Sequence, residues 1–180
     1  MKTALVILAE GFEEIEAIAV IDILRRAGVN CTIAAQHDGK FVTGKTGIQV
    51  VADELFHALR DKSFDLLVLP GGPGSRHLRK DTSVLEMIRK QVGEGRLTAA
   101  ICAATTVLYD AGILEGREYT GHFSVKAELP QIIDNQKVVW DGNVATSQGA
   151  GTALEFALSL VERLYDAKKA EKISKAICLT

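Results

Sequence analysis

Short, continuous apolar runs alternate along the chain with longer segments in which apolar residues recur at helical spacing. The short runs have the length and composition of buried strands and cover residues 4–8, 31–35, 65–69 and 98–101. The longer segments predict helices over residues 12–27, 82–93, 103–111, 152–166 and 168–177. Gly28 and Gly112 follow two of these segments and are expected to end them.

Two further segments have the pattern of hairpins. Residues 40–51 (KFVTGKTGIQVV) combine turn glycines with β-branched flanks. Residues 137–140 and 144–146 flank an Asp-Gly pair at 141–142, which is a typical two-residue turn.

Apolar strands separated by helices predict a mostly parallel sheet that is covered on both faces. With right-handed crossovers, this is a doubly wound, three-layer α/β/α sandwich, and we expect residues 1–180 to form a single domain. Ligands bind such folds at the carboxyl ends of the strands. We therefore expect a site to be assembled from the loops at residues 9–13, 70–77, 102–103 and 147–151.

Composition and charge narrow the function classes. The chain has 47% hydrophobic and 24% charged residues, as soluble globular proteins do, and its net charge of −2 favours neither nucleic acid nor an anionic membrane as partner. The apolar run after Lys2 is short and precedes an acidic amphipathic segment, so we interpret it as a strand rather than a secretion signal. Three scattered cysteines without a Cys-x-x-Cys pair indicate a reducing compartment, and we expect a cytoplasmic protein.

Neither glycine-rich turn has the spacing of a nucleotide site. LPGGPGS at 69–75 lacks the Gly-Lys-Ser/Thr of a P-loop and the third glycine of a dinucleotide fingerprint, and SQGAGTAL at 147–154 also lacks the third glycine. Both are therefore interpreted as tight strand-to-helix turns. No pair of His, Cys or Asp residues has metal-ligand spacing, so we expect no metal and no cofactor.

Cys102 lies between a strand that ends at Ile101 and a helix that begins at Ala103 or soon after. A thiol at a helix N-terminus can form a thiolate near neutral pH. A free cysteine is also often a small buried hydrophobe, and the residues alone leave both interpretations open. Cys31, within a strand, and Cys178, in the tail, are expected to be unreactive.

An acidic side chain in the first predicted helix is a candidate partner for this thiol. Glu13 and Glu14 are explained by the helix dipole, which favours acids in the first turns. Glu16 instead begins an apolar stripe, so burial should raise its pKa and keep a proton available. The stripe continues through Val20, Ile23 and Ala27. The helix is apolar on more than one side, which predicts a second buried face such as a subunit interface.

Four histidines complete the candidate residues. His37, His57 and His77 lie in or near predicted loops and are expected to be exposed. His122, in YTGHFS, could lie close to a strand end and therefore near Cys102, although a lone histidine is more often structural.

Four segments, in their order along the chain, resemble the DJ-1/ThiJ/PfpI superfamily, and in particular the branch of the parkinsonism-associated deglycase and its bacterial relatives. They are ALVILAEGFEEIEA, DLLVLPGG, AAICAATTVL and TSQGAGTALEFAL, and the similarity extends from about Thr3 to the last helix. The resemblance implies a flavodoxin-like sandwich that forms a homodimer, with a reactive Cys102 on a strained turn and a protonated Glu16 hydrogen-bonded to it. It also implies an anion pocket lined by the amides of Gly72 and Ala103, with His122 near the cysteine.

Three departures from related patterns limit the function. Gln148 and Ala150 replace an arginine and a proline that are frequent in this branch, which weakens any anion site there. Ala103 stands where the protease-like branch has a histidine, which argues against a peptidase. Alanines flank Cys102 and no His-x-Glu follows, which argues against a glutamine amidotransferase.

Together, the residues and the resemblance predict a cofactor-free glyoxalase or deglycase that acts on 2-oxoaldehydes such as methylglyoxal, or on their adducts. Cys102 would add to the aldehyde and Glu16 would shuttle protons, while Gly72 and Ala103 hold the oxyanion and His122 assists. The alternatives are an oxidative-stress sensor or redox-regulated chaperone acting through oxidation of Cys102, and a structural domain with an unreactive thiol.

Overall fold

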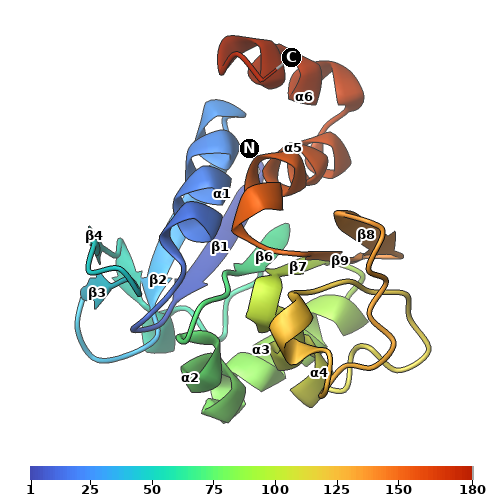
Figure 1. Ribbon diagram of the computed structural model, residues 1–180. Coiled ribbons are helices and arrows are strands. Elements are labelled where there is room, and N and C mark those ends of the chain that lie inside the picture. The colour runs from blue at the N-terminus through green and yellow to red at the C-terminus, as the bar shows by residue number, and fades with distance from the viewer. Residues whose placement is uncertain (180) are drawn as a thin grey trace.

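A seven-stranded sheet lies between two layers of helices in the computed structural model, which describes residues 1–179 (Figure 1). The strand order is β5-β2-β1-β6-β7-β9-β8, and all neighbours are parallel except β8 and β9. The strands are β1 (Thr3–Leu8), β2 (Asn30–Ala35), β5 (Glu54–Leu55), β6 (Leu66–Leu69), β7 (Leu97–Ile101), β8 (Val138–Asp141) and β9 (Val144–Ser147). The chain passes from β1 to β2 on one side and later continues from β6 on the other, so the topological switch point lies between β1 and β6.

The helices cover both faces of the sheet (Figure 1). One layer holds α1 (Glu14–Arg26) and α5 (Ala153–Leu164), with α6 (Ala167–Ala176) packed on α5, and the other holds α2 (Ser75–Lys80), α3 (Thr82–Gly93) and α4 (Thr105–Asp110). In β1, Val6 and Leu8 pack into the first layer while Leu5 and Ile7 pack into the second. Burial on both faces explains why the strands are continuous apolar runs.

The predicted sandwich is confirmed, and so are both hairpins. Residues 40–51 form a separate two-stranded sheet of β3 (Phe41–Thr43) and β4 (Gln49–Val51). β8 and β9 pair across a turn at residues 142–143, one residue later than the predicted Asp-Gly turn, because Asp141 pairs with Val144. The predicted loop at 70–77 is wrong at its end, because α2 begins at Ser75. With six residues after Pro73 and Gly74, α2 is too short to show a helical period, and the two-residue β5 was missed for the same reason.

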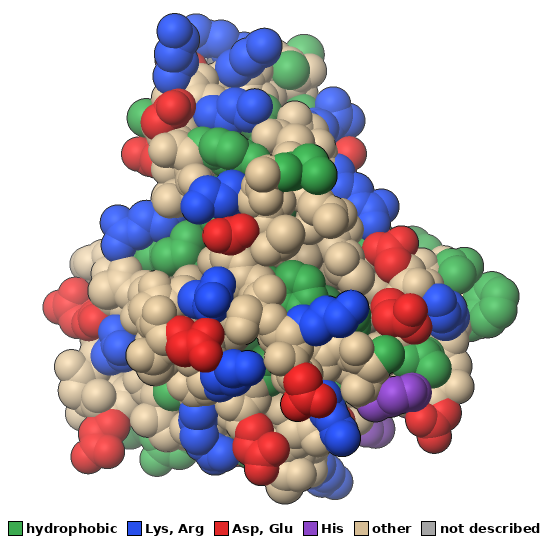
Figure 2. All heavy atoms as spheres, turned by 180° about the vertical axis from the view of Figure 1, so that it is seen from behind, with side chains coloured by type: hydrophobic (Ala, Val, Ile, Leu, Met, Phe, Trp, Pro, Cys, Tyr) green, Lys and Arg blue, Asp and Glu red, His purple; other side chains and the backbone are tan. Residues whose placement is uncertain are grey.

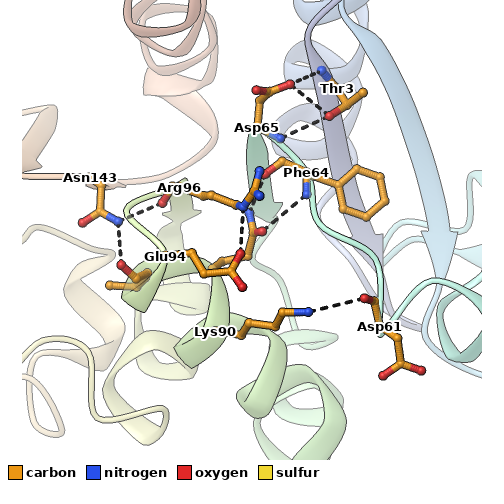
Figure 3. A network of polar contacts seen from close by, with 10 residues as sticks. Thr3, Asp61, Phe64, Asp65, Lys90, Glu94, Arg96 and Asn143 are labelled. Carbon is orange, nitrogen blue, oxygen red and sulfur yellow. Dashed lines mark hydrogen bonds and ion pairs between the residues drawn. The ribbon is translucent and has the colours of Figure 1, made fainter.

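Polar side chains fasten the amino ends of the strands (Figure 3). The Thr3 amide and hydroxyl donate to Asp65 Oδ2 at 2.8 and 3.0 Å, which ties the start of β1 to the start of β6. The Asn143 side-chain amide donates to the carbonyls of Val92 and Arg96 at 3.1 and 2.8 Å. These contacts hold together the edge of the sheet opposite to the one at which a ligand is expected.

Charged side chains of both signs are interspersed over the face shown in Figure 2, with lysines gathered at α6 at the top. Within residues 1–179, no helix is long and apolar enough to cross a membrane.

Candidate active site

Cys102 has a backbone conformation that is unfavourable for its residue type. Its φ is 64°, in the left-handed region, where a side chain with a Cβ costs about 1–2 kcal/mol. The residue follows β7 directly and opens a 3₁₀ turn, Cys102–Ala104, that leads into α4. The strained strand-to-helix turn that the family resemblance implies is therefore present, and the thiol is 9% exposed at the carboxyl edge of the sheet.

Glu16 lies against this thiol from the first turn of α1. Its side chain is 1% exposed, and the predicted stripe through Val20, Ile23 and Ala27 is buried with it. The Gly71 amide donates to Glu16 Oε2 at 2.8 Å, and the Glu16 carboxyl hydrogen-bonds to the Cys102 thiol. Glu13 has a specific role beyond the helix dipole, since its Oε2 accepts from the Glu16 amide at 2.8 Å and caps α1.

The turn after β6 brings backbone to the sulfur where no side chain fits. A Cβ on Gly71 would lie 2.7 Å from both Cys102 Cβ and Glu16 Oε2, and one on Gly72 would lie 2.6 Å from the Gly11 carbonyl oxygen. The amides of Gly72 and Ala103 both donate toward the Cys102 sulfur. The two amides predicted to form an oxyanion pocket are thus brought together at the thiol.

Burial changes the pKa of both members of the pair. Burial raises the pKa of Glu16 to about 7, in the predicted direction. Burial, and then the neighbouring Glu16 carboxylate, raise the pKa of Cys102 to about 12, although the Ala103 and Gly72 amides act in the opposite direction. Burial and the Glu16 carboxylate therefore oppose the helix terminus in setting the pKa of Cys102. Ionisation of this sulfur depends on whether Glu16 can take its proton.

His122 lies beside the thiol, as predicted. Its amide donates to the Cys102 carbonyl at 3.4 Å. The ring Nδ1 is 2.8 Å from the Ser124 hydroxyl and accepts from the Ser124 amide at 3.3 Å. A neutral His122 therefore carries its proton on Nε2, and a proton exchanged with a substrate must pass through that atom.

The other candidate residues lie apart from the pair. Cys31 is buried, and burial raises its pKa to about 12, whereas Cys178 is exposed. His57 and His77 are exposed, and His37 is half-buried with its Nε2 3.0 Å from Glu10 Oε1. Within the described part of the chain, no group of three His, Cys, Asp or Glu side chains could hold a metal ion.

A pocket of about 450 Å³ lies between residues 121–126 and 148–152, and its lining includes His122 but neither Cys102 nor Glu16. Gly149 belongs to its lining, and a Cβ built there would lie 4.0 Å from Cys102 Sγ. Sequence analysis missed Gly149 and Gly71, because only the folded chain shows which atoms their missing side chains would meet. It also missed Lys45, whose ammonium lies 3.6 Å from Glu13 Oε1 and lowers the pKa of Glu16.

Comparisons with known proteins show the family and the fold that this chain shares. The family model described as DJ-1/PfpI family matches residues 2–163. The Drosophila melanogaster protein dj-1beta is 40% identical over 98% of this chain and 96% of its own, and the crystal structure of DJ-1beta superposes with a TM-score of 0.95 over 98% of this chain and 97% of its own. A Caenorhabditis elegans relative named glutathione-independent glyoxalase DJR-1.2 is 37% identical over 99% of this chain and 97% of its own. A structure of Toxoplasma gondii DJ-1, described as oxidized, has a TM-score of 0.94 at 33% identity and covers 99% of this chain and 98% of its own.

Proposed function

The chain belongs to the DJ-1/PfpI family, and from its site we propose that it is a cysteine-dependent, cofactor-free enzyme acting on 2-oxoaldehydes such as methylglyoxal, or on their adducts with amines and thiols. The observation that carries this proposal is the buried Cys102–Glu16 pair, with two amides directed at the sulfur. The C. elegans relative named as a glyoxalase supports the same activity at the level of the family.

In the first step, Cys102 Sγ attacks the aldehyde carbon while its proton passes to the Glu16 carboxylate. A base with a pKa of about 7 is half ionised at neutral pH and hydrogen-bonded to the thiol, so it can remove this proton as the bond forms. The carbonyl oxygen becomes an oxyanion that the amides of Gly72 and Ala103 stabilise. Glu16 then passes the proton that it took from the thiol to this oxygen, which gives a hemithioacetal and restores the carboxylate.

In the second step, Glu16 removes the proton from the carbon that bears sulfur and returns one to the neighbouring carbon. The intermediate is an enediol, and the product is a thioester of lactate on Cys102 when methylglyoxal is the substrate. Water then hydrolyses the thioester, releases lactate and restores the thiol. His122 Nε2 is the group proposed to assist proton transfer in this hydrolysis.

Loss of either member of the pair should abolish this chemistry. We expect Cys102→Ser and Glu16→Gln to lower kcat/KM for methylglyoxal by at least about 100-fold, since each removes a nucleophile or a general base. Consumption of methylglyoxal and formation of lactate are the measurements. Cys178→Ser, which removes an exposed thiol, should retain full activity. Full activity in Cys102→Ser or in Glu16→Gln would end the proposal.

The second candidate is a redox sensor or redox-regulated chaperone with little turnover. It is favoured by the likeness to a structure described as oxidized, and by Glu16, whose proton could hydrogen-bond to an oxidised Cys102. Intact mass after mild peroxide treatment, combined with steady-state turnover, separates the two. Stoichiometric oxidation of Cys102 with negligible turnover would favour the sensor.

We also propose that the chain forms a homodimer through α1. Ile15 and Ile18 are 57% and 42% exposed on this helix, whose other apolar residues are buried or half-buried, and Leu154 is 40% exposed on α5. A groove of about 620 Å³ is lined by Ile15, Leu154 and Leu158 among others. A second copy would cover an apolar surface that a monomer leaves in water.

A further inference from the structure

We propose that the pocket between residues 121–126 and 148–152 is the route by which substrate reaches Cys102, and that it selects neutral 2-oxoaldehydes with a bulky, aromatic substituent. The inference rests on the proposed function and names its substrate class. It is carried by the glycine that separates the thiol from the pocket, by the aromatic wall and by the charges at the rim.

Gly149 has no side chain at the point where the pocket comes near the thiol. A Cβ at this position would lie 3.3 Å from His122 Cδ2, 3.8 Å from Glu16 Oε1 and 4.0 Å from Cys102 Sγ. A side chain at this position would therefore occupy the space beside the nucleophile, the proposed base and the histidine. A substrate carbonyl that enters along Gly149 meets all three groups at once.

Hydrogen bonds hold the Gly149 backbone in this position. The Thr152 hydroxyl accepts from the Gly149 amide at 3.2 Å, and the Thr152 amide donates to the Gly149 carbonyl at 2.8 Å. The Ser147 hydroxyl lies 2.7 Å from the Thr152 hydroxyl and joins the loop to the end of β9. The φ of Gly149 is 161°, an extended conformation open to any residue, so its backbone does not demand glycine. The consequence of the glycine is therefore the open space.

The second observation is an aromatic wall. Phe123 lines the pocket with a side chain that is 78% exposed. Its ring lies 4.1 Å from the His122 ring, centroid to centroid, with an interplanar angle of 36°. An exposed phenyl ring held beside the site offers an aromatic substituent a stacking surface, and such a contact adds to the burial of apolar area.

The third observation is the charge balance at the rim. The Lys126 ammonium is paired with the Asp134 carboxylate, and the Gln148 side chain donates to the Asp134 carbonyl at 2.7 Å. The cation nearest the pocket is thus neutralised by its own neighbour, and Gln148 brings no charge. A neutral substrate enters without displacing this pair, whereas an anionic one must compete with Asp134.

The experiment compares glyoxal, methylglyoxal and phenylglyoxal as substrates of the full chain. We expect the highest kcat/KM for phenylglyoxal. Phe123→Ala should lower that value by about three- to tenfold and change the value for glyoxal little, because glyoxal cannot reach the ring. Gly149→Ala should lower the value for phenylglyoxal by at least about tenfold and that for glyoxal less.

Two matched controls test the general effect of these substitutions. Phe41 is 63% exposed on β3, outside the pocket, and Gly93 ends α3 with nothing within 4 Å of a built Cβ. Phe41→Ala and Gly93→Ala should leave the ranking of the three aldehydes unchanged. Thermal melting of each variant identifies any loss of folding.

The outcomes separate the inference from the proposed function. If the wild type converts the aldehydes but both pocket variants lower all three rates equally, the route and its preference are wrong while the function stands. If the wild type converts none, the function fails, and the route is tested by labelling Cys102 with iodoacetamide and with N-benzyliodoacetamide. Slower labelling by the benzyl reagent alone in Gly149→Ala would support the route, and equal slowing would overturn it.

Discussion

Two side chains share the chemistry of this site. Because burial raises the pKa of Glu16 to about 7 and that of Cys102 to about 12, the pair loses its first proton near neutral pH and its second far above it. Between these two values the pair carries a single negative charge, which lies mainly on the Glu16 carboxylate. We therefore expect the thiol to react through its neighbour rather than through its own acidity.

This coupling predicts a pH dependence for Cys102. Below pH 7, Glu16 holds its own proton and cannot accept that of the thiol, so the rates of alkylation and of aldehyde turnover should rise as the pH increases through about 7. In Glu16→Gln the rise near pH 7 should disappear. The carboxylate that raises the pKa of Cys102 is then absent, so the thiol should titrate below the wild-type value of about 12.

Mass spectrometry measures the rate of alkylation of each thiol. The exposed Cys178 is an internal comparison, because it shows how the reagent itself responds to pH. An inflection at Cys102 that survives unchanged in Glu16→Gln would show that the carboxyl does not control the sulfur.

At the scale of elements, the β3–β4 hairpin is fastened to the start of α1. The Lys45 ammonium lies 3.6 Å from Glu13 Oε1, and the Thr46 amide and hydroxyl donate to Glu14 Oε1 at 2.7 and 2.5 Å. Glu13 in turn caps the turn that carries Glu16. The hairpin therefore sets both the position and the electrostatic surroundings of the proposed base.

Removing the lysine charge should change the titration of the site. The Glu13 carboxylate raises the pKa of Glu16 and Lys45 lowers it, so Lys45→Gln should raise it and move the inflection of Cys102 alkylation to higher pH. Lys40→Gln is the matched control, because Lys40 precedes the same hairpin and pairs with Glu54. A shift to lower pH, or the same shift in both variants, would contradict this role.

Helices and strands could be predicted from the sequence wherever a local pattern of residues determines them. β1 and α3 follow directly from an apolar run and a helical period, and the burial of Glu16 follows from the stripe it begins. The contacts that make the site depend on tertiary structure. Gly71 meets Glu16 across 55 residues of sequence, and Lys45 reaches Glu13 only because the hairpin folds onto α1. Burial at Cys102 also opposes the effect of the helix terminus on the pKa of the thiol, which a local pattern could not reveal.

At the scale of the whole molecule, the exposed apolar face of α1 predicts the assembly state. We expect light scattering to give twice the mass of one chain, and Ile18→Glu to halve it, because a buried, unpaired charge opposes association. Val51→Glu, at a position 58% exposed on β4, should leave the dimer intact. A wild-type monomer at micromolar concentration would exclude this interface.

The left-handed backbone of Cys102 also lowers the stability of the whole fold while it places a thiol in the site. Glycine would relieve the conformational cost at this position, and it would remove the sulfur as well. A library of random variants selected for heat resistance alone should therefore accumulate glycine at position 102. The same library selected for survival in a toxic aldehyde should keep cysteine there and accept a lower melting temperature.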